Sequence, residues 1–137
     1  MSESGGWVAG RLVEVDEAEC WTLLGSVPVG RLAWHGSDGL TVVPVNFVVA
    51  DRVIRVRTAP YTLLARECDD APVAFQVDEL DPFTRSGWSV LVRGTAHIDF
   101  TPGHAEAAQP DVWPGGAKPL HVEVPVEEIS GRRLLPS

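Results

Sequence analysis

Residues 88–100 alternate between hydrophobic and polar side chains, and this alternation restricts the fold more than any other feature of the chain. A period of two is what an antiparallel strand needs when one of its faces is buried and the other meets solvent. Leu91 is the exception to it. The hydrophobic face holds Trp88, Val90, Val92, Gly94, Ala96 and Ile98, and the polar face holds Ser89, Arg93, Thr95, His97 and Asp99. The segment is therefore expected to be a half-buried antiparallel strand.

Other short strands are expected on both sides of this segment, separated by turn residues. They cover residues 29–34, 40–49, 53–58, 73–78, 120–126 and 131–135. Pro44 lies inside the second of them, and proline cannot donate to a sheet ladder. That strand is therefore expected to be irregular, or to lie at an edge, near residue 44. Gly94 indicates a bulge or a close approach of two backbones.

Three short helices complete the expected elements. Asp16 and Glu19 have the spacing of a capping box, which predicts a helix that begins at Asp16 and ends near Gly25 or Ser26. Proline is favoured at the first position of a helix, so Pro60 predicts the start of a second helix, which is expected over residues 61–68. A third helix is expected over residues 103–109, followed by a loop rich in proline and glycine at 110–119.

The composition supports a mainly β fold. Eleven prolines and 13 glycines argue against a helical bundle, and a doubly wound sheet would need a helix between most strands. The 137 residues fit one domain. We expect a closed or nearly closed antiparallel β-barrel with a few short helices at residues 11–137, preceded by a flexible tail at residues 1–10.

Charge and cysteine usage limit the setting and the partners. The formal net charge of −8 disfavours nucleic acid, because phosphate backbones repel an acidic surface. No stretch approaches the ~20 apolar residues of a membrane span, and residues 1–10 lack the basic start of a secretory signal. Cys20 and Cys68 form no C-x-x-C pair. A cytoplasmic protein with reduced thiols is expected.

The best candidate for chemistry is the segment of residues 55–62. Arg55 and Arg57 share one face of their strand, and the chain then enters a helix whose first N–H groups favour anions. Thr58 and Thr62 add hydroxyl donors, and arginine suits phosphate geometry. The sequence thus predicts a phosphate cradle. The alternative is that Thr58 or Ala59 only caps the helix while the arginines pair with surface carboxylates such as Asp51.

Two further segments are weaker candidates. Asn46 lies in an apolar strand, where a buried amide without partners costs ~1–3 kcal/mol, so it contacts either a ligand or neighbouring backbone. Trp88 opens a strand, where its indole either covers a flat ligand or packs in a core or a subunit interface. The four histidines lack metal-ligand spacing with a cysteine or carboxylate, so no metal site is expected.

Over residues 12–135 the chain resembles the pyridoxamine 5′-phosphate oxidase-like family, the flavin-binding split barrels. Four segments carry this resemblance in the family's order: LGSVPVGRLA at 24–33, VPVNF at 43–47, Arg57-Thr58 just before a short helix, and GWSVLVRG at 87–94. The closing ISGRRL at 129–134 is also typical of small bacterial members. Each motif is weak alone, and their order and spacing make the match specific.

The resemblance implies a six-stranded antiparallel split β-barrel that forms a homodimer with FMN at the subunit interface. The residues that it assigns to the cofactor are Pro44, Val45 and Asn46 at the isoalloxazine, Arg57, Thr58 and Thr62 at the phosphate, Trp88 and Ser89 on a lining strand of either subunit, and Arg132 from the C-terminal strand. Small members often have lysine after the serine or threonine that begins the short helix, whereas Leu63 follows Thr62 here. One lost charge-assisted contact costs ~1.5–3 kcal/mol, so the expectation is either weak or absent FMN binding or compensation by Arg55 or Arg132.

Two classes of function follow from the resemblance. The first is an FMN-dependent oxidoreductase acting on a small organic substrate, in which the flavin carries the electron chemistry and no residue is assigned as catalytic. The second is a non-catalytic flavin-binding or cofactor-lost barrel used for storage, sensing or partner binding, with Leu63 as its main support. The family also allows a deazaflavin coenzyme or, less favoured, haem in place of FMN.

Overall fold

A computed structural model describes residues 11–58, 62–99 and 120–136. The expected tail at 1–10, the helix at 103–109 and the loop at 110–119 lie outside these residues. The elements are β1 (Arg11–Val15), α1 (Glu17–Leu24), β2 (Val29–Gly36), β3 (Gly39–Ala50), β4 (Val53–Thr58), α2 (Leu63–Glu67), β5 (Pro72–Asp81), β6 (Ser86–Thr95), β7 (His97–Asp99) and β8 (Leu120–Leu135). Neither helix has the length and apolar character that a membrane crossing requires.

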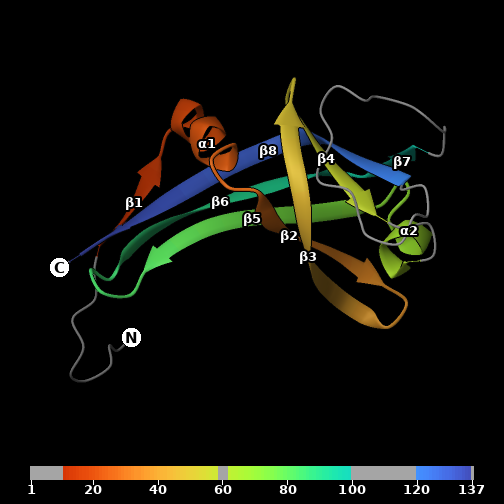
Figure 1. Cartoon of the computed structure of the whole chain (residues 1–137), viewed down its shortest axis with the longest axis horizontal. Coiled ribbons are helices and arrows are strands. Elements are labelled where there is room, and N and C mark those ends of the chain that lie inside the picture. The colour runs from red at the N-terminus through yellow and green to blue at the C-terminus, as the bar shows by residue number, and fades with distance from the viewer. Residues whose placement is uncertain (1–10, 59–61, 100–119, 137) are drawn as a thin grey trace.

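Six antiparallel strands form a closed ring, which confirms the expected split barrel. Their order around the ring is β8, β4, β3, β2, β5 and β6, and β6 returns to pair with β8. β1 and β7 add to β8 outside this ring. Figure 1 shows β8 running along the molecule, with α1 near one end and β7 and α2 near the other.

β8 differs from the expectation of two separate strands, because it is continuous over 16 residues. The polar stretch at 127–130 does not interrupt it. Ile129 pairs with Val92 of β6 in the ladder, and Glu128 reaches Arg93 at 3.7 Å on the exposed side. The charged residues thus belong to the solvent face of a strand. β1 was not expected, and it pairs with the last five residues of this strand.

The alternation at residues 88–98 is confirmed, since all six hydrophobic-face residues from Trp88 to Ile98 are buried. The segment forms two strands, however, because it leaves the ladder at Ala96. There the backbone N–H donates to Ala71 O at 2.9 Å, and the carbonyl accepts from Asp70 N at 2.8 Å. The ladder register also shifts between Arg93 and Gly94, where an added Cβ would overlap Pro125 O. The expected irregularity at Gly94 is therefore present.

α1 confirms the expected cap at its start. The Glu19 N–H donates to Asp16 Oδ1 at 2.9 Å, while the Glu19 carboxylate pairs with Arg133 of β8 instead of reaching back to Asp16. The helix ends at Leu24, and Gly25 caps it. It packs closely on β8, because a Cβ on Gly131 would lie 2.7 Å from Cys20 Sγ.

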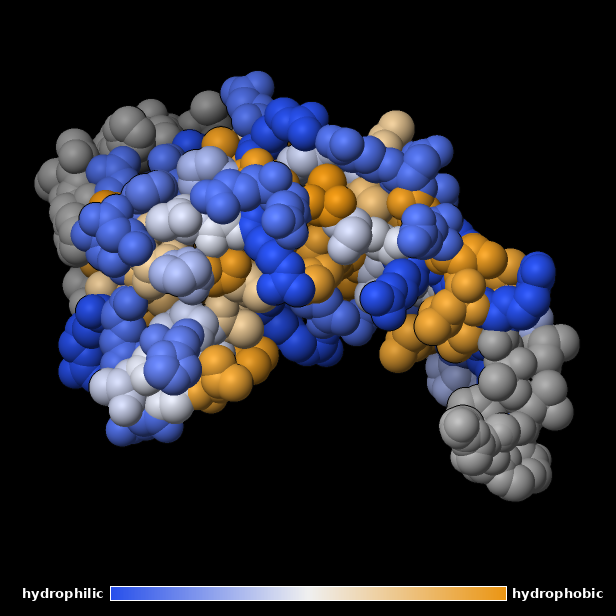
Figure 2. Space-filling view, turned by 180° about the vertical axis from the view of Figure 1, so that it is seen from behind, coloured by the Kyte–Doolittle hydropathy of each residue, from blue (hydrophilic) through white to orange (hydrophobic). Residues whose placement is uncertain are grey.

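The core fills the barrel with aliphatic side chains around the rings of Phe47 and Phe75, and Trp34 and Trp88 are also buried in it. Phe47 and Phe75 meet edge to face, with ring centroids 4.7 Å apart. Fully buried neighbours include Leu32, Ile54, Val56, Val77, Val90, Val92, Val122 and Val124. On the face shown in Figure 2, hydrophilic residues surround smaller hydrophobic areas.

Gly30→Ala is expected to lower the free energy of unfolding by about 1–3 kcal/mol. A Cβ at Gly30 would overlap the ring of Phe75, which is fully buried and cannot swing away. Urea denaturation followed by tryptophan fluorescence measures this change.

Gly25→Ala is the matched control. Its Cβ would lie 3.7 Å from Trp21 O, and Gly25 has helical dihedral angles that alanine adopts without strain. Equal stability of the two variants would contradict the close contact at Gly30.

Candidate functional site

An open edge of β3 is the first feature of the candidate site. Residues 29–36 of β2 pair with 39–46 of β3, but only residues 47–50 of β3 pair with β4. Among the described residues, no second strand pairs with the part of β3 that contains Pro44. This confirms the expected edge. Pro44 and Asn46 are both exposed, so Asn46 is not the buried amide that the sequence suggested.

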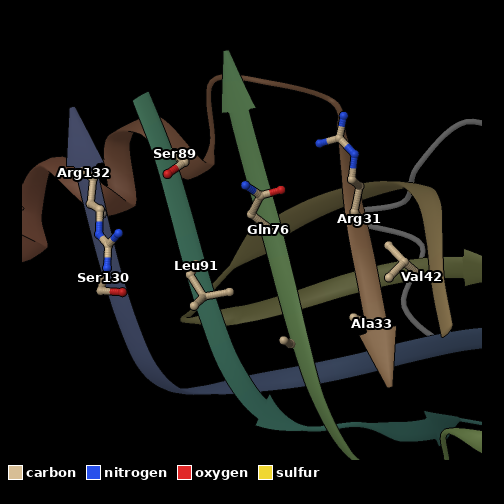
Figure 3. Close-up of a pocket in the computed structure, with 10 residues that line it drawn as sticks. Arg31, Ala33, Val42, Gln76, Ser89, Leu91, Ser130 and Arg132 are labelled. Carbon is tan, nitrogen blue, oxygen red and sulfur yellow. The ribbon is translucent and has the colours of Figure 1, made fainter. Parts of the chain in front are cut away.

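A groove of about 450 Å³ lies on the outer face of the sheet formed by β3, β2, β5, β6 and β8. Its floor holds small or apolar side chains, among them Ala33, Ala74 and Leu91. Figure 3 shows Arg31 and Arg132 on opposite sides of it, with Gln76 and Ser89 between them. Arg31 is held by Asp78 at 3.4 Å, and Arg132 has no ion-pair partner within the described chain. This surface suits a flat, polar-edged or anionic ligand.

The outer face of β3 connects this groove with a second, charged surface on β4. Val42 lines the groove, Pro44 lies opposite Arg31 in the ladder, and Val48 lies opposite Arg55. Side chains at every second position share a face, so these residues and Asn46 form one row. Six residues of strand span about 20 Å, which is the separation between groove and arginines along the row.

Arg55 and Arg57 extend from β4 beside β8, on the face away from the core. Arg55 pairs with Glu123 at 2.8 Å, so the carboxylate partner is on the neighbouring strand and not at Asp51. Arg57 lies opposite His121 in the ladder. His121 is only 6% exposed, and burial, followed by the charges of Arg57 and Arg55, lowers its pKa. The cluster of Arg55, Arg57, His121 and Glu123 is called the arginine cluster below.

The threonines of the expected cradle meet on the other side of β4. Thr58 is buried, and its Oγ1 lies 2.8 Å from Thr62 Oγ1. Thr62 caps α2 by accepting from Ala65 N at 3.2 Å, so neither Thr58 nor Ala59 is the cap. α2 begins at Leu63, two residues later than expected, and has five residues. A helix this short adds little dipole, so the arginines are the main attraction for an anion.

A single carboxylate fixes the position of α2. Glu67 Oε1 accepts from Trp34 Nε1 at 2.9 Å, and Oε2 accepts from the N–H and hydroxyl of Ser37 at 3.2 and 2.7 Å. These hydrogen bonds, that of Trp34 first, lower the pKa of Glu67. The short helix is thus tied to the β2–β3 hairpin.

The structure divides the residues that sequence analysis assigned to the cofactor. Pro44 and Asn46 lie on the outer row of β3, Ser89 and Arg132 line the groove, and Arg55 and Arg57 form the arginine cluster. Thr58 and Thr62 contact each other on the other side of β4, away from the arginines. Three more residues direct their side chains inward. Val45 and Leu63 pack against the core, and Trp88 is 8% exposed within it. Trp88 thus adopts the packing alternative, on the strand face opposite Ser89.

Sequence reasoning missed His121, Arg31 and Gln76. His121 gave no signal, because its neighbour Arg57 lies 64 positions away and only the β4–β8 register joins them. Arg31 and Gln76 lie opposite each other in the β2–β5 ladder. The sequence signal that could have found them is that each is a polar residue at an outward position of an alternating strand.

One further group combines carboxylates with histidine. Ligand atoms of Asp69, Asp70 and His97 lie within 4.8 Å of one another, and all three residues are exposed. Asp69 accepts from Ile98 N, and Asp70 lies 2.9 Å from His97 Nδ1. These bonds join the α2–β5 turn to β7, which accounts for the arrangement without an ion.

Comparisons with known proteins decide the family. The model of the pyridoxamine 5′-phosphate oxidase family matches residues 16–133. The chain belongs to this family. It is 36% identical over 134 residues to the uncharacterized protein Rv0080 of Mycobacterium tuberculosis, a match that covers 93% of the chain and 88% of that protein. The family was expected from the four sequence segments, and the expectation is confirmed.

Two solved structures are similar to this family member in both sequence and fold. An FAD binding protein from Mycobacterium smegmatis is 34% identical with a TM-score of 0.80, and the match covers 91% of this chain and 100% of that one. A conserved protein of unknown function from Corynebacterium diphtheriae is 30% identical with a TM-score of 0.75, covering 90% and 98%. Both agree with the split-barrel fold.

The stability of the protein is expected to fall as the pH drops below about 6.5, in part because of His121. Its pKa in the folded state lies below the ordinary histidine value of about 6.5, so the unfolded chain binds the proton first. This contribution is present above pH 6.5 and is lost as the pH falls toward the folded-state pKa. Urea unfolding at several values between pH 7.5 and 5 measures it.

His121→Gln is expected to show a shallower loss of stability over that range. His35→Gln is the control, because His35 is exposed in the β2–β3 hairpin. An identical pH dependence in His121→Gln and the unmodified protein would contradict the role of burial at His121.

Proposed function

We propose that this protein binds a flavin, with FMN as the first candidate, and acts as a flavin-dependent oxidoreductase on a small organic substrate. The observation that carries the proposal is the arginine cluster, which lies in the β4–α2 region where the family resemblance assigns the cofactor phosphate. The 34% identical structure named as an FAD binding protein supports a flavin and makes FAD the second candidate. A bound flavin supplies two-electron and one-electron chemistry.

The residues present fit a phosphorylated flavin. Arg55 Nε is a buried donor without a hydrogen-bond partner, although the same guanidinium pairs with Glu123 through Nη2. Such a donor costs free energy unless a ligand or water accepts from it. A phosphate oxygen beside Arg55 and Arg57 would satisfy it. Leu63 carries no charge, and its side chain packs against the core. The phosphate therefore depends on the arginines.

The ring system is assigned to the outer row of β3, within reach of a phosphate on the arginine cluster, and the groove that faces it is assigned to the partner protomer. Pro44 and Asn46 lie on this row, and the groove has a floor of small or apolar side chains, Ala33, Ala74 and Leu91, on which a planar ring can pack. Gln76 and Ser89 of the partner's groove can hydrogen bond to the polar edge of the ring, and Arg132 of that groove can stabilise negative charge there. A groove of this volume is within the range of ~300–1,000 Å³ for small-molecule sites.

A homodimer is part of the proposal. Val29, Leu40 and Val42 are exposed by 49%, 85% and 60% on the outer face of β2 and β3, beside the groove. A partner protomer placed there would cover these side chains and exclude water from the ring. It would also bring a second groove close to the β3 row, so that Ser89 and Arg132 could contact the flavin of the other subunit.

Val42→Asp is expected to convert the dimer to a monomer, because an interface of this kind does not accept a buried unpaired charge. Sedimentation velocity measures the change. Leu80→Asp is the control, since Leu80 is similarly exposed at the β5–β6 hairpin, away from the groove. A dimer that persists in Val42→Asp would contradict the placement of the interface.

Arg57→Ala is expected to weaken FMN binding by more than tenfold, as expected for one lost charge-assisted contact. Fluorescence quenching of FMN on titration with protein measures the dissociation constant. Arg93→Ala is the matched control, because Arg93 is an exposed strand arginine of β6 whose partner is Glu128. Unchanged affinity in Arg57→Ala would remove Arg57 from the site.

The test of the function is an absorbance spectrum of the purified protein, followed by titration with FMN, FAD and a deazaflavin. Flavin peaks near 375 and 450 nm, and bleaching by NADPH with reoxidation by a small acceptor, are the expected results. A flavin that binds but does not turn over would favour storage or sensing. Failure to bind any of the three would overturn the flavin assignment.

A further inference from the structure

His121 is a buried polar residue with one ring nitrogen, Nε2, that no hydrogen bond of the structure satisfies. It lies on β8 between Arg57 of β4 and Asp99 of β7, which are its ladder neighbours on either side. The residue is 6% exposed, and its Nε2 has no hydrogen-bond partner. A buried nitrogen without a hydrogen-bond partner costs roughly 1–3 kcal/mol in general, so such atoms are rare unless a ligand or water makes the missing hydrogen bond.

Charged side chains surround His121, and the buried atoms among them that lack partners point to a hydrogen-bond acceptor as the missing group. Arg55 and Arg57 face it from β4, Glu123 faces it from β8, and Asp99 faces it from β7. His97, also on β7, lies opposite Glu123 and interacts with Asp70 instead. Glu123 is engaged by Arg55 at 2.8 Å. The second buried donor without a partner, Arg55 Nε, belongs to this same cluster.

We propose that His121 is a direct ligand of the phosphate of the bound flavin, together with Arg55 and Arg57. The inference rests on the proposed function and adds a residue to its site. The phosphate oxygens would accept hydrogen bonds from His121 Nε2 and from Arg55 Nε. One group would then satisfy both buried donors. The interaction is charge-assisted when the imidazole carries a proton.

Phosphate binding then changes the proton content of the protein. Without an anion, burial and the two arginines lower the pKa of His121 and keep the imidazole neutral near pH 7. A phosphate placed among these groups adds negative charge beside His121 and so favours the imidazolium. His121 therefore takes up a proton as a phosphorylated flavin binds.

The experiment is isothermal titration calorimetry at pH 7 in two buffers of different ionisation enthalpy, which gives the number of protons exchanged on binding. The ligands are FMN, FAD and riboflavin, which lacks phosphate. The phosphate itself titrates near pH 6, so the difference between the unmodified protein and His121→Gln isolates the histidine. His97→Gln is the matched control on β7.

The expected results are proton uptake with FMN or FAD that is lost in His121→Gln, and affinity for the same ligand that falls about tenfold to hundredfold. Riboflavin should bind without proton uptake by His121, and its affinity should not change in His121→Gln. The His97→Gln variant should keep both the proton uptake and the affinity of the unmodified protein. A ¹⁵N spectrum of the histidine rings in the unmodified protein, recorded with and without FMN or FAD, provides the second measurement. It should show His121 changing from neutral to charged.

Two outcomes would overturn the inference, and only the second would also overturn the proposed function. Flavin binding with the same proton exchange in His121→Gln, or with His121 still neutral in the spectrum, would remove His121 from the site and leave the flavin assignment intact. The absence of FMN, FAD and riboflavin binding to the unmodified protein would overturn the proposed function and this inference together.

Discussion

The barrel depends on the pairing of one strand, β8, with two different neighbours. Its first half pairs with β4 and its second half with β6, and this double pairing closes the ring. The change of neighbour occurs at Val126, opposite the register shift after Arg93, where Gly94 lets the backbone of Pro125 approach. β8 also carries His121 near its start and Arg132 near its end, so the same strand positions residues of the arginine cluster and of the groove.

The sequence predicted most of the fold because local patterns determine most strands. The alternation at 88–98 identified the buried face correctly, and Pro44 and Gly94 marked the true edge and bulge. The errors share one cause, which is long-range pairing. Residues 127–130 look like a polar connection until β6 lies beside them, and Ala96 leaves its strand because Ala71, on a distant part of the chain, takes its hydrogen bond.

In the candidate site, too, local sequence patterns could be predicted and long-range strand pairing could not. Arg55 and Arg57 share one face of β4, as the sequence predicted, but Thr58 and Thr62 meet on its other side, because alternation turns Thr58 inward. The four residues therefore do not form the single cradle that was expected, and the start of α2 was placed two residues early. His121 could not be found, because an isolated histidine near a proline-rich stretch has no pattern. Only the β4–β8 register puts it opposite Arg57. The acidic chain thus concentrates positive charge locally by pairing strands, and not by a basic run of sequence.

The link between Glu67 and the β2–β3 hairpin has a consequence for evolution of the sequence. Hairpin tips ordinarily accept substitution and insertion more readily than other parts of a protein. Here Ser37 donates twice to the carboxylate that anchors α2, and Trp34 donates once. Relatives that lengthen this hairpin or replace Ser37 must therefore hold the short helix by another contact, and the residue at position 67 should vary together with the length of the turn.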